Sequence, residues 1–414
     1  MSSEEQTDEP ARDLPRPGTQ AILLAAVVAT GMGQTLVFAI LPSLGRAAGM
    51  ADIQVGIIIS CSSLMFALAS PVWGRFSEHL GRKPVLVFGL AGYTVGTVVF
   101  ASIFWLGIQG LLGGLTLLFA LVASRVVQAA LMAGTPPAAA AYMADITSAE
   151  GRTRGMGRIG AAHNLGTVLG PAVGGLLATL SLVLPLYVAA SVTAVMGLFA
   201  LAALRESPWI LRRGPLAQPF SVGEAMRGSF AAWLDRRLVS VLLVGFLMFM
   251  AFALVQQTLG FLFQDRFAMS PAEAAGGVGL AMMLAALASL TAQGVVVQKL
   301  GWSPRALLRL AMPVMLAAVL VLIRAPDQLQ VTIAVIMLGL GLGLGMPGVS
   351  SAASLRVGNH EQGAVAGLMS ACPALGFIVG PVVGTGLYQI NPLSPYWLVV
   401  ALLVPLSIAV WRIK

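Results

Sequence analysis

The amino-acid sequence predicts an all-helical integral membrane protein with twelve transmembrane helices, arranged as two related bundles of six. The first observation is composition: of the 414 residues, 58% are hydrophobic and only 10% are charged, and the mean hydropathy is +0.90. Soluble domains usually carry about 25% charged residues, so water is not the main solvent of this chain. The second observation is a series of long apolar runs, and the third is an internal repeat of glycine and proline positions.

The apolar runs define the individual helices. A helix that crosses a bilayer needs about 20 mainly apolar residues. Runs of that length, separated by charged or turn-forming residues, predict spans at 20–44, 53–73, 84–106, 112–143, 156–180, 184–204, 239–264, 271–297, 304–323, 329–354, 363–388 and 394–411. Several connections are only a few residues long, so no large extramembrane domain is expected.

The same pattern divides the chain into four regions: a tail over 1–18, a bundle over 19–204, a linker over 205–238 and a second bundle over 239–414. The tail is acidic and lacks the basic start and short apolar core of a secretory signal, so a disordered cytoplasmic segment is expected. In the linker, Val222, Met226, Phe230 and Trp233 recur at helical spacing. This predicts an amphipathic helix lying in the membrane interface, as a plain connector or with a regulatory role.

The positions of the basic residues predict the orientation in the membrane. A net charge of +8 and a pI of about 10.2 would also suit a nucleic-acid binder. If the N-terminus is inside, however, all Lys and Arg fall in cytoplasmic segments except Arg46, Arg266 and Arg324 outside and Arg125 within a span. Basic residues are enriched in cytoplasmic loops. We therefore expect both termini in the cytoplasm, a bacterial inner membrane as the location, the lipid bilayer as a partner, and no nucleic-acid partner.

An internal repeat relates the two predicted bundles. The glycines and proline of the fifth span recur 210 residues later in the eleventh span, where Gly367, Gly376, Gly380, Pro381 and Gly384 correspond to Gly157, Gly166, Gly170, Pro171 and Gly174. Thr385 stands at the position that corresponds to Gly175. Two homologous halves around a central pathway are typical of transporters, with the solute site where the halves meet.

A charged segment after the second span carries the first family resemblance. It reads Gly74-Arg-Phe-Ser-Glu78-His-Leu-Gly81-Arg82-Lys83. It resembles the G-x-L-a-D-r-x-G-r-k motif of the major facilitator superfamily, with Glu78 in place of the usual Asp. We expect Gly74 to allow a close helix contact, Gly81 to allow a turn, and Glu78 beside Arg82 and Lys83 to form a charge cluster that latches the halves. Alternatively, the two basic residues only hold the topology.

Two further motifs match the same family. Arg125-Val-Val-Gln128 in the fourth span resembles the R-x-x-q-G motif, with Ala129 in place of the glycine. A charge at mid-span costs at least about 2.5 kcal/mol, so an intramembrane Arg is functional by default, although a packing role bonded to carbonyls is the alternative. The fifth span matches the antiporter motif at every glycine and at the proline: Gly157, Gly166, Gly170, Pro171, Gly174 and Gly175. The resemblance implies a major facilitator fold and a drug/proton antiporter of the twelve-span group.

One feature departs from that group. None of the sixteen acidic residues lies at the centre of a predicted span, and the first span offers Gln34 where many such exporters have a carboxylate. A histidine titrates near neutral pH, so His163 is a candidate for the coupling proton, although a neutral histidine bonded between helices is as good an interpretation. Asp265 is a second candidate, with capping of a helix or pairing with Arg266 as the preferred interpretation.

The polar residues of the spans indicate the kind of substrate. Gln256, Gln257 and Phe261 bring amides and a ring to the half opposite Arg125, which suits an amphipathic molecule that is neutral, zwitterionic or anionic. The predicted substrate and proton pathway comprises Gln34, Arg125, Gln128, His163, Asn164, Gln256, Gln257 and Phe261.

The sequence therefore predicts a secondary active transporter that works by alternating access, as a proton-coupled exporter of a drug, metabolite or siderophore-like compound. An uptake or facilitated-diffusion carrier and a transport-inactive sensor of the same fold remain alternatives. We expect no enzyme activity, no metal and no cofactor, with a proton gradient as the energy source and a monomer as the working unit. Cys61 and Cys372 lie in spans of opposite halves, so no disulfide is expected.

Overall fold

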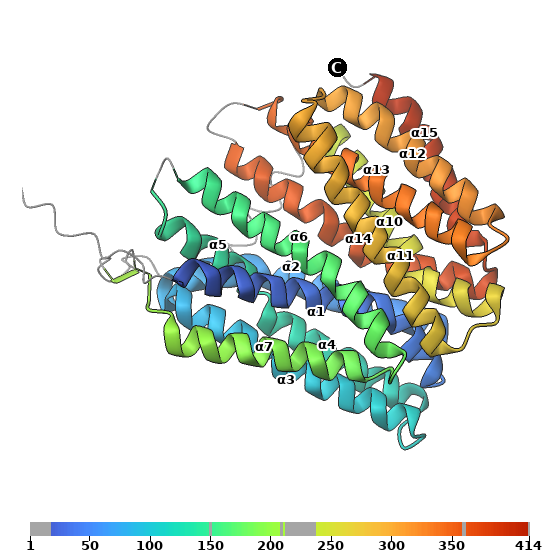
Figure 1. Cartoon of the computed structure of the whole chain (residues 1–414), viewed down its shortest axis with the longest axis horizontal. Helices are drawn as coiled ribbons and strands as arrows, with labels where there is room; N and C mark the ends of the chain where they lie inside the picture. Colours follow the sequence, from blue (N-terminus) through green and yellow to red (C-terminus); the bar gives the residue numbers. More distant parts are fainter. Residues whose placement is uncertain (1–17, 149–150, 208–209, 212–236, 358–361, 413–414) are drawn as a thin grey trace, which may run out of the picture.

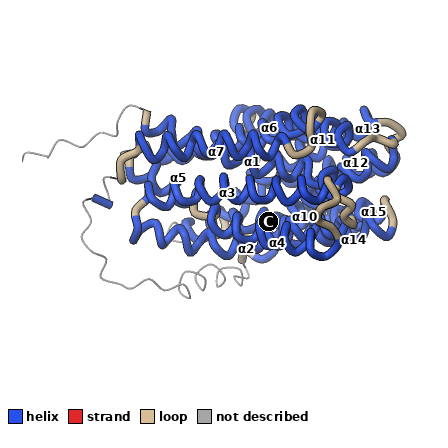
Figure 2. Tube along the Cα trace, turned by 90° about the horizontal axis from the view of Figure 1, so that it is seen from below, coloured by secondary structure: helices blue, strands red, loops and turns tan. Residues whose placement is uncertain are grey.

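The computed structural model describes residues 18–148, 151–207, 210–211, 237–357 and 362–412 (Figure 1). Nearly all of the predicted tail and the predicted amphipathic helix of the linker lie outside the described residues. Within the described part of the chain, the structure is helical with short connections and no strand (Figure 2).

The first bundle contains the helices that precede the linker. They are α1 (Thr19–Ala47), α2 (Asp52–Leu80), α3 (Arg82–Ile108), α4 (Gly114–Met132), α5 (Thr135–Asp145), α6 (Arg152–Ala178) and α7 (Leu184–Ala203). Helices α4 and α5 together form the fourth predicted span. The break between them precedes Pro136 and Pro137, which lack backbone N–H groups and disfavour helical geometry in the residue before them.

The second bundle repeats this order after the linker. Its helices are α10 (Val239–Phe267), α11 (Pro271–Ala292), the π-helical turn η2 (Gln293–Lys299), α12 (Pro304–Arg324), α13 (Gln328–Ser354), α14 (Gln362–Ile390) and α15 (Ser394–Arg412). Local sequence explains where several begin. Before α11, the Ser270 hydroxyl accepts from the backbone N–H of Glu273 at 3.3 Å, and the Glu273 carboxylate accepts from the Ser270 N–H at 2.8 Å. This capping box satisfies two N–H groups that the helix itself cannot.

The predicted spans agree with these helices. One helix, however, is less apolar than the others. Eleven helices of the described residues are long and apolar enough to cross a membrane. Helix α6 is not among them, because it carries Arg152, Arg154, Arg158, His163 and Asn164 together with many glycines. It nevertheless packs along α1 of its own bundle and α11 of the second bundle (Figure 1). The fold is thus the predicted twelve-helix arrangement, with α6 as its most polar member.

The two bundles converge at one end and separate at the other (Figure 1). We call the end with the α1–α2, α10–α11 and α14–α15 connections the closed end. The opposite end, with the α2–α3, α5–α6 and η2–α12 connections, is the open end. Along α6 and α11, the ribbons approach each other toward the closed end and diverge toward the open end (Figure 1).

Candidate functional site

Three glycines of the antiporter motif bring α6 into backbone contact with α1. A Cβ atom on Gly166 would lie 2.6 Å from the carbonyl oxygen of Val28, and one on Gly170 would lie 2.8 Å from the nitrogen of Leu36. A Cβ atom on Gly174 would lie 2.9 Å from the Leu36 side chain. These positions therefore require glycine for steric reasons, as small residues at helix interfaces usually do.

The last glycine of the motif joins the two bundles. A Cβ atom on Gly175 would lie 2.8 Å from the Cα of Gly279 in α11 and 3.0 Å from the carbonyl oxygen of Ala275. In return, a Cβ atom on Gly279 would lie 2.5 Å from the carbonyl oxygen of Pro171. Helix α6 runs through Pro171 without a break. The motif thus places α6 between α1 of its own bundle and α11 of the other.

The second bundle repeats this packing, as the internal repeat predicts. Cβ atoms on Gly376 and Gly380 would each lie 2.9 Å from backbone atoms of Met250 in α10. Thr385, at the position that corresponds to Gly175, contacts Gly56 of α2, whose Cβ would lie 2.7 Å from the carbonyl oxygen of Pro381. The α6–α11 and α2–α14 interfaces are therefore related, with glycine facing glycine in one and threonine facing glycine in the other.

An arginine at the closed end connects four helices. Arg46, near the end of α1, bonds the Asp52 carboxylate of α2 through Nε and Nη2, both at 2.9 Å. It also bonds the Asp265 carboxylate of α10 through Nη1 at 2.5 Å and Nη2 at 2.9 Å. The Tyr388 hydroxyl of α14 donates to the same Asp265 carboxylate at 2.9 Å. Bidentate Arg–carboxylate pairs of this kind are strong and geometrically specific.

This arrangement corrects the expectation for Asp265. The sequence favoured a helix cap or a pair with Arg266, but Asp265 pairs with Arg46 across the bundle interface. Arg266 instead donates to the carbonyl oxygens of Leu322 and Ala325 at the end of α12, at 3.0 and 3.1 Å. Sequence reasoning could not find the pair, because its partners are 219 positions apart and only interhelical geometry brings them together.

Aromatic and apolar contacts complete the closed end. Phe38 of α1 stacks on Phe377 of α14, with ring centroids 5.1 Å apart. The Arg46 guanidinium lies 4.7 Å from the ring centroid of Phe261, which is fully buried. A Cβ atom on Gly260 would lie 2.8 Å from the Pro42 side chain. Phe261, predicted to lie on the pathway, is thus positioned within the contacts that close this end.

The open end contains a cleft of about 490 Å³ between α6 and α11. It is lined by one face of α6 and by one face of α11 with η2, through Gly157, Gly160, Ala161, Asn164, Leu165, Leu290, Gln293, Gly294 and Gln298. No atom lies within 4 Å of a Cβ built on Gly157. Gly157 therefore differs from the other motif glycines, because it borders open space and not a helix contact.

Arg125 lies inside the first bundle, where it binds the next residue of its motif. Its side chain is 5% exposed, Nη1 donates to the Gln128 Oε1 at 2.6 Å, and the guanidinium lies 5.0 Å from the Phe100 ring centroid. Gln128 in turn donates to the Thr97 hydroxyl at 2.6 Å and to the Tyr93 carbonyl at 3.2 Å. Arg125 and Gln128 thus form one network that joins α4 to α3.

The other predicted pathway residues are spread along the interface between the bundles. The His163 side chain contacts Gly31 of α1, since a Cβ on Gly31 would lie 3.4 Å from its Nδ1 atom. Asn164 lines the cleft, and Gln34 is half-buried on α1. Gln256 and Gln257 are buried in α10, and neither Gln257 amide atom has a hydrogen-bond partner among the described residues. The structure brings Arg125 and Gln128 together and distributes the others over α1, α6 and α10.

The charged motif near the open end is partly helical. It occupies the last turns of α2, and Gly81 alone forms the turn to α3, with a φ of 105°. A Cβ atom on Gly81 would collide with the Glu206 carboxylate, so this position requires glycine for steric as well as conformational reasons. Gly74 differs from expectation, because its Cβ would lie 3.6 Å from Pro137, which is an ordinary contact.

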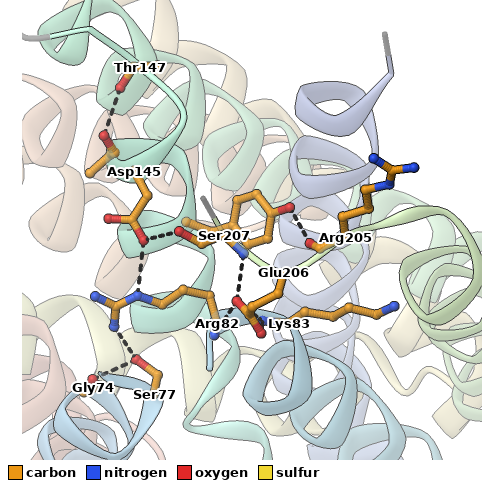
Figure 3. Close-up of polar contacts among 11 residues, drawn as sticks. Gly74, Ser77, Arg82, Lys83, Asp145, Thr147, Arg205, Glu206 and Ser207 are labelled. Atoms are coloured by element: carbon orange, nitrogen blue, oxygen red, sulfur yellow. Dashed lines mark hydrogen bonds and ion pairs between the residues drawn. The ribbon is translucent and has the colours of Figure 1, made fainter. Parts of the chain in front are cut away.

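The basic residues of this motif bond Asp145 of their own bundle and Glu206 at the start of the linker. Arg82 donates to the Ser77 hydroxyl at 2.6 Å and to the Asp145 carboxylate at 3.3 Å (Figure 3). The Glu206 carboxylate accepts from the backbone N–H groups of Arg82, at 2.9 Å, and Lys83, at 3.3 Å. Glu78 is exposed on the last turn of α2. Its role in a latch between the bundles stays a prediction.

Fold and interface together define a polytopic membrane protein of two repeated six-helix bundles with a cleft between them. A sequence model of the Major Facilitator Superfamily matches residues 23–381. The chain belongs to this superfamily of membrane transporters, as its motifs predict.

Relatives and solved structures agree with this assignment. The chain is 26% identical over 384 residues to Multidrug resistance protein 2 of Bacillus subtilis, covering 91% of this chain and 90% of that protein. It is 29% identical over 371 residues to Tetracycline resistance protein, class C, of Escherichia coli, covering 89% of both.

Among solved structures, the human organic anion transporter MFSD10 (TETRAN) aligns with a TM-score of 0.65 at 22% identity, covering 94% of this chain and 98% of that one. The nucleoside transporter NupG aligns with a TM-score of 0.72 at 13% identity, covering 95% and 98%. At such identities the structures establish the fold alone.

Proposed function

We propose that the chain is a proton-coupled exporter of an uncharged, zwitterionic or anionic amphipath, and that it works by alternating access as a monomer. The observation that carries this proposal is the asymmetry of the bundle interface. Contacts between the bundles close one end, while a cleft separates α6 from α11 at the other. A rocking transporter must pass through such a state, with its site accessible from one side only.

The distribution of charge supports a cytoplasmic open end. Helix termini there carry Arg75, Arg152, Arg154, Lys299 and Arg305. The three basic residues at the closed end include Arg46, whose charge is balanced by two carboxylates. By the positive-inside tendency, the open end faces the cytoplasm and the state described here takes up its substrate from inside the cell.

The polar residues at the interface between the bundles support the proposal that the substrate has no fixed positive charge. Within the described helices, carboxylates occur only near the ends, as with Asp145 and Asp265. Arg125 is buried at mid-helix and would repel a cation. The relatives named for multidrug and tetracycline resistance favour export of a drug-like molecule over uptake.

His163 is the proposed carrier of the coupling proton. It lies against α1 at Gly31 and is next to Asn164 of the cleft. A histidine exchanges its proton within the physiological pH range. Movement of α6 against α1 would change its surroundings between the two states.

The test is cellular retention of amphipaths in bacteria that lack their main efflux pumps. Cells that express the protein should retain less of a neutral or anionic compound than cells that express Arg125→Ala. Lower retention of permanent cations alone would contradict the proposed substrate class. Greater retention than in empty-vector cells would indicate uptake, and no change for any compound would leave export unsupported.

A further inference from the structure

We propose that the cleft between α6 and α11 is a binding site for the uncharged polar groups of an amphipathic substrate. This inference rests on the proposed function, which it deepens by naming the site and the groups it recognises. The two helices belong to different bundles and touch at Gly175 and Gly279. Toward the open end they enclose the space of about 490 Å³. Binding sites for drug-sized molecules are commonly about 300–1,000 Å³.

The lining of the cleft is polar but uncharged. Asn164, Gln293 and Gln298 contribute carboxamides, and none of the nine lining residues is ionisable. A carboxamide both donates and accepts hydrogen bonds. Leu165 and Leu290 supply apolar surface beside the amides. This combination suits hydroxyl, carbonyl and amide groups on an apolar skeleton, and it offers no partner to a permanent charge.

The three carboxamides retain hydrogen-bonding groups that a ligand could use. Gln293 donates to the Ser289 hydroxyl at 3.3 Å, which leaves its amide oxygen as an acceptor. The side chains of Asn164 and Gln298 have no hydrogen bond to the residues that the structure describes. Because these groups lie at a cleft and not in a packed core, a bound molecule could reach them without displacing a helix.

The π-helical turn explains why the two glutamines of η2, Gln293 and Gln298, share the cleft. Residues five positions apart lie about 140° apart around an α-helix, so Gln293 and Gln298 would face different directions there. In η2 the backbone hydrogen bonds join residues five positions apart, as in the bond of 3.0 Å from the Leu300 N–H to the Val295 carbonyl oxygen. Such i+5 bonding brings residues five apart to one side, and π-helical turns are frequent at functional sites.

Glycines keep the cleft open. Cβ atoms on Gly157, Gly160 and Gly294 would have no atom within 4 Å. Larger side chains at these positions would occupy the space directly. Because the site has one wall on each bundle, movement of the bundles changes its shape, and a ligand that binds one shape better shifts the equilibrium between states.

The test is equilibrium binding to the purified full-length protein in lipid nanodiscs without a proton gradient. The probes are chloramphenicol, which is uncharged and carries an amide and hydroxyls, and tetraphenylphosphonium, a permanent cation. Asn164→Leu, Gln293→Leu and Gln298→Leu should each weaken chloramphenicol binding about three- to tenfold, as expected for one lost hydrogen bond. Gln389→Leu, the same change at an exposed position of α14, should leave it unchanged.

Filling the cleft gives a second measurement. Gly157→Trp should abolish chloramphenicol binding while the thermal unfolding temperature stays near that of the wild type, because the position borders open space. Unchanged binding in the three amide variants, or loss of binding in Arg125→Ala alone, would overturn the site. Absence of chloramphenicol binding, or stronger binding of the cation, would overturn the ligand class.

The binding test is separate from the proposed function. If cells show no export although purified protein binds chloramphenicol with this pattern of variants, the transport proposal fails and the site stands. If cells export neutral compounds but the cleft variants do not alter binding, the site fails and the transport proposal stands.

Discussion

Arg46 and Asp265 form the ion pair that joins the two bundles at the closed end, and each keeps a partner of its own bundle. Arg46 also binds Asp52, and Asp265 also accepts from Tyr388. When the bundles separate, the guanidinium retains one carboxylate and the Asp265 carboxylate retains one donor. The pair can therefore break without leaving a buried charge unpartnered, which is the costly outcome for ion pairs.

We expect Asp265→Asn to shift the protein toward the state that is open at this end. The Arg46 and Asp265 side chains are 22% and 42% exposed, so the loss is modest, about 1 kcal/mol or roughly a fivefold change in the ratio of states. Spin labels at the ends of α1 and α10 would report the distance distribution.

The matched control is Asp52→Asn, which removes a carboxylate within the first bundle and leaves the Arg46–Asp265 pair in place. It should shift the distribution less than Asp265→Asn. Equal shifts would show that the pair across the interface has no special part in closing this end.

The antiporter glycines should differ sharply in their tolerance of a methyl group. Gly170→Ala places a Cβ within 2.8 Å of the α1 backbone, so the helices must separate, at a cost of about 1–3 kcal/mol. Gly157→Ala meets no neighbour and should be tolerated. Thermal unfolding in detergent would measure both. A fall of similar size in the two variants would mean that the methyl acts through the helix itself and not through the α1 contact.

The turn at Gly81 should be equally intolerant. Its φ of 105° is strained for any other residue, and a Cβ would also meet Glu206, so Gly81→Ala should destabilise the protein by about 1–3 kcal/mol. Gly110→Ala is the matched control. Its φ of 72° carries strain, but no atom lies within 4 Å of its Cβ. If Gly110→Ala costs as much as Gly81→Ala, the contact with Glu206 has no measurable effect.

The sequence predicts the helices and the repeat well because both depend on local composition. The glycine spacing of α6 even predicts close packing, although it does not show that Gly175 faces the other bundle while Gly157 faces a cleft. The sequence does not predict the partner of Asp265 or the π-helical turn that begins at Gln293. An ion pair between distant helices depends on their relative placement, and Gln293-Gly-Val-Val-Val has no pattern that separates a π turn from an α-helix. The clustering of glutamines near Gly294 was the one available signal.

Gln128 should prove as important as Arg125 for the first bundle. It holds the buried guanidinium at 2.6 Å and ties it to Thr97 of α3. Gln128→Leu removes the hydrogen-bonding partner of a buried charge, so we expect a loss of about 1–3 kcal/mol in stability. In Arg125→Ala the same change should cost less, because no charge is left behind. Thermal unfolding of the four proteins of this cycle would measure the coupling, and additive effects would contradict a shared network.

Proton coupling should depend on His163 and not on the closed-end carboxylates. In proteoliposomes, His163→Gln should retain exchange of labelled for unlabelled substrate but lose accumulation driven by a pH gradient, because exchange moves no net proton. Asp265→Asn should change the rate of both processes and preserve the dependence on the gradient, since Asp265 lies at the closed end, where it pairs with Arg46. Loss of gradient-driven accumulation in Asp265→Asn with normal coupling in His163→Gln would reverse the assignment and make the closed-end carboxylate the proton carrier.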